Sequence, residues 1–303
     1  MGVNALENRT LGRYLIQDVL GQGGMGVVYR AIDETDGREV ALKTICPATP
    51  IAQAAIERFR REALWLARCH DPHIATVYRA GRAGGIDFIA MELMASTLQA
   101  RIAAGHAGPA EVEGIGAQIL MGLAAAHRAG IVHRDVKPAN IGISRTGMVK
   151  LLDFGVADTL PWSANVEDSS TGASCLAVVG SVPYMPPEQL RGETVDARAD
   201  IYGTGAVLYE LATGRQPFQE STGAALIDAV LNRRPSPPSS INPAIGGALD
   251  RVILRALAKK PSSRHPSAAA MMDALLRQRD DGRDEAARTF SRAAVAFVES
   301  RAS

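Results

Sequence analysis

The first third of the chain alternates apolar and polar positions around glycine-rich turns, which is typical of β-strands. Asp36-Gly37 has the composition of a tight hairpin turn between two of these strands. Farther along, residues 51–69 place their apolar side chains at helical spacing. The pattern therefore predicts one helix at 51–69 and strands at 14–16, 27–31, 39–43, 75–80 and 87–92.

After Met94 the apolar positions mainly follow helical spacing. Residues 156–180 are small, polar and turn-forming without a clear period, so we expect a loop there. The pattern predicts helices at 111–129, 200–213 and 248–258, and short strands near 141–144 and 148–152. A β-rich first part and a helical second part predict an α+β fold with two lobes.

The composition, with 47% apolar and 21% charged residues, is that of an ordinary globular protein. A net charge of +1 gives no reason to expect nucleic acid or an anionic membrane as a partner. No apolar run approaches the roughly 20 residues that span a bilayer, and residues 1–13 lack the apolar stretch of a secretory signal. We expect a cytoplasmic protein, with membrane attachment only through sequence outside this chain.

Cysteine and lysine usage add two details. The three cysteines are odd in number and far apart, which favours reduced thiols over disulfides or a metal site. Only five of the 33 basic residues are lysines, and the other 28 are arginines. Where arginine is so strongly preferred, a lysine suggests that the position needs a compact point charge and not a planar guanidinium. These residues are Cys46, Cys69, Cys175, Lys43, Lys137, Lys150, Lys259 and Lys260.

The segment His133-Arg134-Asp135-Val136-Lys137-Pro138-Ala139-Asn140 contains the most informative chemistry, and Asp153-Phe154-Gly155 begins eighteen residues after Asp135. Asp135 can accept a proton from an attacking hydroxyl, and Lys137 can reach a transferring phosphate. Asn140 and Asp153 can hold magnesium. Together these groups predict phosphoryl transfer from a magnesium nucleotide.

A glycine-rich pattern, Gly21-x-Gly23-x-x-Gly26, precedes a strand-like segment. The same pattern marks dinucleotide-binding folds, but there a helix follows. The strand context favours a hairpin that covers phosphates. Lys43 lies 17 residues after Gly26, in Val40-Ala41-Leu42-Lys43.

Together these motifs resemble the eukaryotic-like Ser/Thr protein kinases of bacteria. The resemblance implies a bilobal protein kinase fold with a small β-rich N-lobe and a larger, mainly helical C-lobe. The implied divisions are an N-terminal extension (1–13), a kinase domain (14–278) made of N-lobe (14–92), hinge (92–95) and C-lobe (96–278), and a C-terminal linker and helix (279–303). The apolar stripe of this last helix could dock on the domain or face a partner.

Several further positions match the family. Met185-Pro186-Pro187-Glu188 resembles the Ala-Pro-Glu end of the activation segment, and Arg264 matches the buried arginine that pairs with its glutamate. Asp200 matches the carboxylate that supports the catalytic loop. Ser181 stands where a hydroxyl residue contacts the catalytic aspartate.

The resemblance also implies ATP and Mg²⁺ as cofactors, with Mn²⁺ as a possible substitute. Lys43 would pair with the phosphates and be oriented by Glu62, with Glu57 as the competing carboxylate. Asn140 and Asp153 would hold the metal. The other nucleotide-binding positions would be Leu20, Gly21, Gly23, Gly26, Val28, Ala41, Met91, Glu92, Met94 and Gly142.

Gly142 departs from the family pattern, which usually has a large apolar side chain beneath the adenine. Its glycine predicts a roomier pocket that Gly142→Leu or Gly142→Met would tighten. Regulation is implied by Arg134, which in kinases often receives a phosphate. We predict autophosphorylation between residues 163 and 174, with Thr171 favoured and Ser174 among the other candidates.

The implied partners are protein substrates and a second copy of the chain for trans-autophosphorylation. Two other functions are weighed against this. A pseudokinase scaffold is disfavoured because Lys43, Asp135, Asn140 and Asp153 are all present. A small-molecule phosphotransferase is disfavoured by the residues that would form a protein-substrate platform, Ser181, Glu188 and Arg264.

Overall fold

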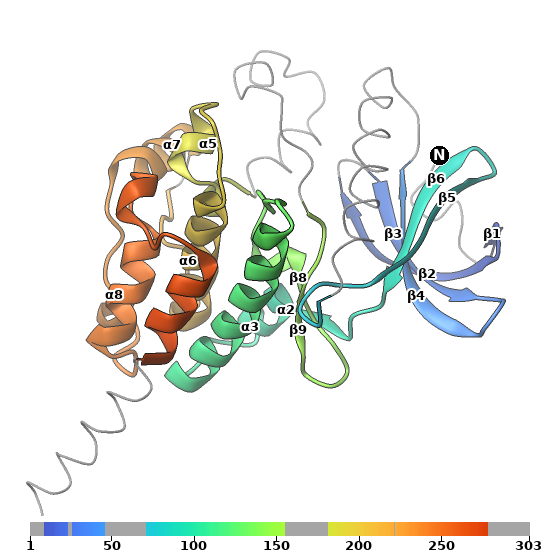
Figure 1. Cartoon of the computed structure of the whole chain (residues 1–303), viewed down its shortest axis with the longest axis horizontal. Helices are drawn as coiled ribbons and strands as arrows, with labels where there is room; N and C mark the ends of the chain where they lie inside the picture. The colour runs from blue at the N-terminus through green and yellow to red at the C-terminus, as the bar shows by residue number, and fades with distance from the viewer. Residues whose placement is uncertain (1–8, 24–25, 46–70, 155–180, 221, 278–303) are drawn as a thin grey trace, which may run out of the picture.

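The computed structural model describes residues 9–23, 26–45, 71–154, 181–220 and 222–277. One antiparallel sheet lies at one end of the molecule, and most helices lie at the other (Figure 1). The sheet has the order β1-β2-β3-β4-β6-β5. Its strands are β1 (Thr10–Leu11), β2 (Tyr14–Gly23), β3 (Gly26–Asp33), β4 (Arg38–Ile45), β5 (Val77–Ala83) and β6 (Ile86–Glu92).

Alternation along the central strands gives this sheet two apolar faces. Val40 and Leu42 of β4 join one buried cluster, together with Tyr14 and Phe88. The intervening Ala41 joins a second cluster on the other face. Met91 of β6 pairs in register with Ala41 and belongs to this second cluster. The second face is therefore the one that carries the predicted nucleotide-binding positions.

A second, three-stranded sheet has the order β7-β8-β9 and connects the two parts of the molecule. It consists of β7 (Ser96–Thr97), β8 (Ile141–Ile143) and β9 (Val149–Leu151). An isolated parallel bridge joins Ile74 to Leu151, and the Ala75 amide donates to the Leu151 carbonyl at 3.0 Å. These bonds fix the segment before β5 against the C-lobe.

The C-lobe is built around one large apolar core. Its central helix, α6 (Arg198–Thr213), is buried along almost its whole length and ends at Gly214, which has a left-handed φ of 70°. The other helical elements are α2 (Leu98–Ala103), α3 (Pro109–Arg128), η1 (Pro138–Asn140), η3 (Val182–Tyr184), α5 (Pro187–Leu190), α7 (Gly223–Asn232), η4 (Pro238–Ser240), α8 (Gly247–Ala256), η5 (Pro261–Ser263) and a final helix over 268–277.

The predicted strands, and the helices at 111–129, 200–213 and 248–258, are confirmed, with small shifts at their ends except that β2 continues seven residues beyond the predicted 14–16. The helical spacing did not predict the short helix α2. It begins at a Thr97 cap whose side chain accepts from the Ala100 amide. The predicted helix at 51–69, the loop at 156–180 and the segment 279–303 lie outside the described residues.

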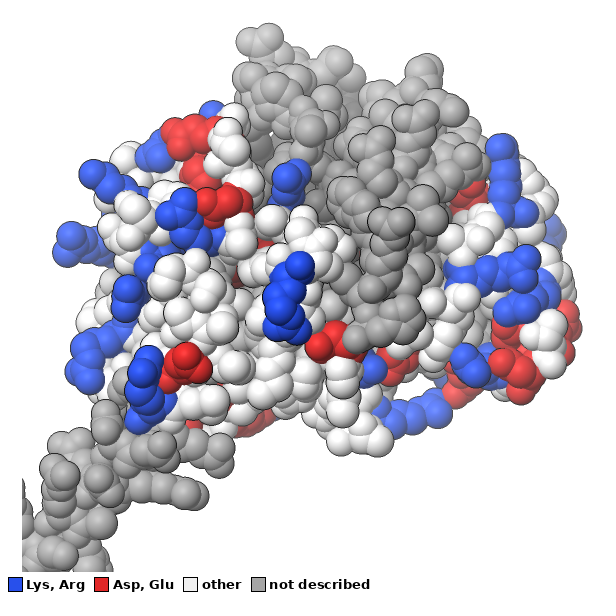
Figure 2. All heavy atoms as spheres, in the orientation of Figure 1, with Lys and Arg blue, Asp and Glu red and all other residues white. Residues whose placement is uncertain are grey.

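On the face drawn in Figure 2, the basic and acidic side chains of the described residues are intermixed. No helix in the described part of the chain combines the length and apolar character that crossing a bilayer requires.

Candidate active site

The carboxylate of Asp200, in the first turn of α6, holds the segment 133–140 through its backbone amides. Its oxygens accept from the backbone amides of His133 at 2.8 Å and Arg134 at 2.7 Å, and His127 Nε2 lies 2.7 Å away. Arg134 has a left-handed φ of 65°, which is unfavourable for a side chain with a Cβ. The bonds to buried Asp200 hold the loop in this shape, as the resemblance implied.

Asp135, the predicted proton acceptor, lies at the centre of a polar group. Lys137 Nζ is 2.8 Å from its Oδ2 and donates to Ser181 Oγ at 2.9 Å. Asn140 Nδ2 donates to the same carboxylate oxygen at 2.8 Å. The Asp135 side chain keeps 34% of its surface exposed, so it remains accessible to a substrate hydroxyl. The structure thus brings these four predicted residues together.

His133 has a structural role. Its ring packs against Phe154 with centroids 4.5 Å apart, and Nε2 lies 2.9 Å from the Leu152 carbonyl. The residue is fully buried. It therefore supports the Asp153-Phe154 segment from the catalytic loop, in agreement with the sequence-based interpretation.

Lys43 extends from β4 toward Asp153, and Nζ lies 2.9 Å from Oδ1. Asp153 has a left-handed φ of 42°. Both side chains are partly exposed, at 20% for Lys43 and 34% for Asp153. Glu62 and Glu57, the candidate orienting carboxylates, lie outside the described residues, as do Thr171 and Ser174.

The glycine pattern lies in the β2–β3 hairpin, as its strand context predicted. Gly21 pairs with Val28, and Gly23 pairs with Gly26. A Cβ on Gly26 would lie 1.8 Å from the Thr44 carbonyl oxygen. Gly26 is therefore required by the close approach of β3 to β4.

Three of the predicted adenine-binding residues, Val28, Ala41 and Met91, share one apolar cluster of the N-lobe sheet. Val28 and Leu93 pack on the apolar cluster that contains Ala41 and Met91. Leu20, near the start of the glycine hairpin, exposes 45% of its surface. The cluster around Ala41 and Met91 is an apolar surface of the kind that lines small-molecule sites.

The prediction of open space above Gly142 is wrong, because Met94 fills it. A Cβ on Gly142 would lie 2.3 Å from Met94 Cγ and 2.7 Å from its Sδ. A side chain at position 142 and the observed Met94 conformation exclude each other. Gly142→Leu is therefore expected to disturb this site while Met94 is present.

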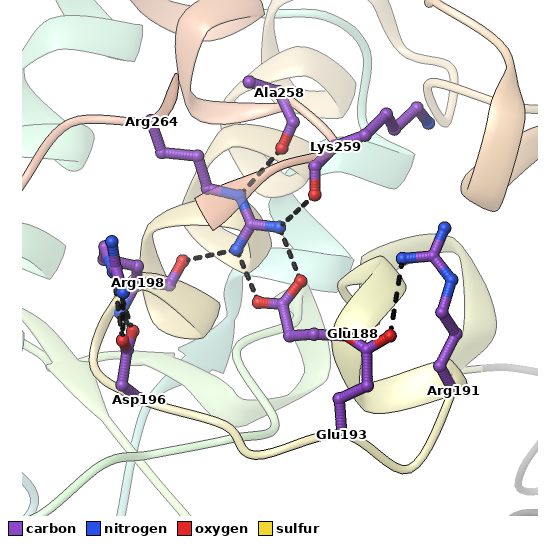
Figure 3. A network of polar contacts seen from close by, with 8 residues as sticks. All are labelled: Glu188, Arg191, Glu193, Asp196, Arg198, Ala258, Lys259 and Arg264. Atoms are coloured by element: carbon purple, nitrogen blue, oxygen red, sulfur yellow. Dashed lines mark hydrogen bonds and ion pairs between the residues drawn. The ribbon is translucent and has the colours of Figure 1, made fainter. Parts of the chain in front are cut away.

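Figure 3 shows the pairing of Glu188 with Arg264, which the resemblance implied. Two guanidinium nitrogens donate to the two carboxylate oxygens at 2.6 and 2.7 Å. The remaining N–H groups donate to the carbonyls of Ala258, Arg198 and Lys259, so all five donors are used. Only 1% of Arg264 and 4% of Glu188 are exposed.

One polar pair was missed by the sequence analysis. Tyr184 donates its hydroxyl to Glu210 Oε2 at 2.5 Å, joining the segment after Ser181 to α6. Burial raises the pKa of Glu210 above its ordinary value. Burial and the bond to Glu210 raise the pKa of Tyr184. The two residues are 26 positions apart and share no sequence motif, so only the fold reveals the contact.

Residues 14–288 match the protein kinase domain family. The chain is 40% identical over 269 residues to the probable serine/threonine-protein kinase SCO3848 of Streptomyces coelicolor, covering 86% of the chain and 39% of that protein. It is 39% identical over 271 residues to the serine/threonine-protein kinase PknB of Mycobacterium leprae, covering 88% of the chain and 43% of that protein.

Among solved structures, the kinase domain of PknI from Mycobacterium tuberculosis superposes with a TM-score of 0.68 at 28% identity, covering 92% of this chain and all of that chain (100%). The chain thus spans less than half the length of these curated relatives but the full length of a solved catalytic domain.

Proposed function

The chain belongs to the protein kinase domain family, and we propose that it transfers the γ-phosphoryl group of ATP to serine and threonine hydroxyls of protein substrates in bacterial signalling. The observation that carries the proposal is the contact of Lys137 with both Asp135 and Ser181. It links a carboxylate that can accept a proton to the segment that would hold a substrate.

The residues fit a magnesium nucleotide in their chemistry. The side-chain amide nitrogen of Asn140 donates a hydrogen bond to the Asp135 carboxylate. The amide oxygen of Asn140 takes no part in this bond. That oxygen and the Asp153 carboxylate are ligands of the type that Mg²⁺ prefers. Within the described residues, no three His, Cys, Asp or Glu side chains lie close enough together to hold a metal ion by themselves.

The residues of the chain have separate roles in this reaction. Asp135 orients the acceptor hydroxyl and takes its proton. Lys43 and Lys137 place positive charge where negative charge on the transferring group must be stabilised. Bound Mg-ATP supplies the phosphoryl group itself. Positioning and electrostatics account for most of the catalysis in this scheme.

The test is transfer of label from ATP to a generic basic protein by the purified chain. Asp135→Asn should lower the rate by roughly 10²-fold or more, because the proton acceptor is lost. Asp36→Asn, in the exposed β3–β4 turn, is the matched control and should leave the rate unchanged. Nucleotide binding without transfer would instead indicate a scaffold. Transfer only to small molecules would indicate the other phosphotransferase class.

The same reaction tests autophosphorylation, which we propose within residues 163–174, with Thr171 as the favoured acceptor and Arg134 as the receiving arginine. Mass spectrometry should find phosphate in this peptide of the wild type and none after Lys43→Met. Mixing the inactive variant with the active chain distinguishes transfer between two copies from transfer within one. An unphosphorylated peptide in the active enzyme would contradict the proposal.

A further inference from the structure

The contact between Met94 and Gly142 carries an inference that rests on the proposed function and deepens it. Gly142 lies on β8 and is buried. A side chain there is excluded by space, because a Cβ would meet Met94 Cγ at 2.3 Å, Sδ at 2.7 Å and Cβ at 3.2 Å. Its φ lies outside the left-handed region, so backbone conformation does not require glycine. The absence of a side chain at Gly142 therefore leaves the volume that the Met94 side chain occupies.

Met94 lies in the short connection from β6 to β7, and bonds on both sides fix that connection. Before it, Lys150 Nζ pairs with Glu92 Oε2 at 2.8 Å, with only 12% and 22% of their side chains exposed. After it, the Ala95 amide donates to the Ile143 carbonyl at 2.9 Å. Lys150 is also the strand partner of Gly142. The backbone that carries Met94 is therefore held directly over β8.

We infer that Met94 supplies, from the hinge, the apolar surface that position 142 would otherwise supply to the base of the nucleotide. Ala41, Met91 and Val28 belong to the opposite, N-lobe side of the same region. Thioether side chains have three rotatable bonds and adapt to irregular partners. The base would thus rest on an adaptable methionine instead of a side chain fixed to a strand.

The inference predicts that substitutions at the two positions compensate each other. Met94→Ala removes the apolar surface and should weaken binding of Mg-ADP about tenfold. Gly142→Leu alone should also weaken it about tenfold, because the introduced side chain and Met94 compete for one volume. The double variant Met94→Ala/Gly142→Leu should bind within about threefold of wild type, since one large side chain again fills the space.

Calorimetric titration with Mg-ADP measures these affinities on the full chain. Met121→Ala, an exposed methionine of α3, is the matched control for Met94→Ala. Gly114→Leu, where an added Cβ meets nothing within 4 Å, is the control for the glycine change. Both controls should bind like wild type. Thermal unfolding of each variant checks that it is folded, and Gly142→Ala in both backgrounds repeats the test with a smaller side chain.

The outcomes are distinguishable. If the wild type binds Mg-ADP and transfers phosphate, but the double variant is as weak as the product of the two single effects, the inference is overturned and the proposed function stands. If the wild type does not bind Mg-ADP, the proposed function fails and the inference fails with it. If the double variant regains affinity while Gly142→Leu alone stays weak, the inference is supported, and the label-transfer assay decides the proposed function separately.

Discussion

At the scale of single residues, Arg264 shows why a planar cation is needed inside the C-lobe. Its five N–H groups all donate, two of them to Glu188 and three to backbone carbonyls. The guanidinium also lies over the Tyr202 ring, 5.0 Å from its centroid. A lysine has a point charge with three donors and cannot satisfy this set of acceptors.

Arg264→Lys is therefore expected to lower the free energy of unfolding by about 3–5 kcal/mol, because buried acceptors lose their donors. Urea denaturation followed by circular dichroism measures the change. Arg251→Lys, an exposed position on α8, is the control and should shift stability by less than about 0.5 kcal/mol. Equal stability of the two variants would show that the network around Glu188 contributes little.

At the scale of elements, α6 acts as the support for the catalytic loop. A Cβ on Gly203 would lie 2.9 Å from both the Cβ and the carbonyl oxygen of Val136. Val136 stands between Asp135 and Lys137, so the helix touches the loop directly beneath the proposed catalytic residues. Glycine allows this approach, although it disfavours the helix by roughly 1 kcal/mol relative to alanine.

Gly203→Ala should consequently reduce both stability and kcat, because the contact with Val136 is with rigid backbone and outweighs the gain in helix propensity. Gly114→Ala on α3 gains the propensity without any contact and should raise the melting temperature. Differential scanning calorimetry and steady-state kinetics give the two readouts. A more stable and fully active Gly203→Ala variant would refute the supporting role of α6.

At the scale of the whole molecule, two ion pairs of the described residues join the lobes in addition to the Lys43–Asp153 pair of the site. Lys150 of β9 pairs with Glu92 at the end of β6, and Arg145 of the β8–β9 turn pairs with Glu39 at the start of β4. The Arg145 hydrogen bond holds the pKa of Glu39 below its ordinary value. The first pair is largely buried, while 74% of the Arg145 side chain is exposed. The Lys150–Glu92 pair should therefore contribute more to the connection between the lobes than the Arg145–Glu39 pair does.

Lys150→Met should raise KM for ATP severalfold and change kcat less than about twofold, because it loosens the hinge without touching the groups that transfer phosphate. Lys260→Met, at an exposed lysine beyond α8, is the control and should change neither constant. Initial rates at varied ATP concentration separate the two constants. A fall in kcat at unchanged KM would contradict this role of the hinge pair.

The sequence by itself determined the α+β division and the main strands and helices. Its motifs predicted Lys43, Asp135, Lys137, Asn140 and Asp153 as site residues, and the family resemblance added Glu188, Asp200 and Arg264. The sequence could do so because period and motif spacing are local properties, and phosphoryl transfer restricts which residue types can serve. The structure then placed Lys137 and Asn140 within hydrogen-bonding distance of Asp135, and Ser181 within hydrogen-bonding distance of Lys137.

Only the tertiary structure decided what fills the space between segments that lie far apart in the chain. Met94 and Gly142 are 48 positions apart, and no pattern of either segment indicates that one side chain occupies the volume of the other. The same holds for Tyr184 with Glu210, and for Gly203 beneath Val136. Such contacts depend on packing in three dimensions. Because the interior is close-packed, whether a neighbouring side chain already fills a volume decides whether a larger residue there stabilises or destabilises the site.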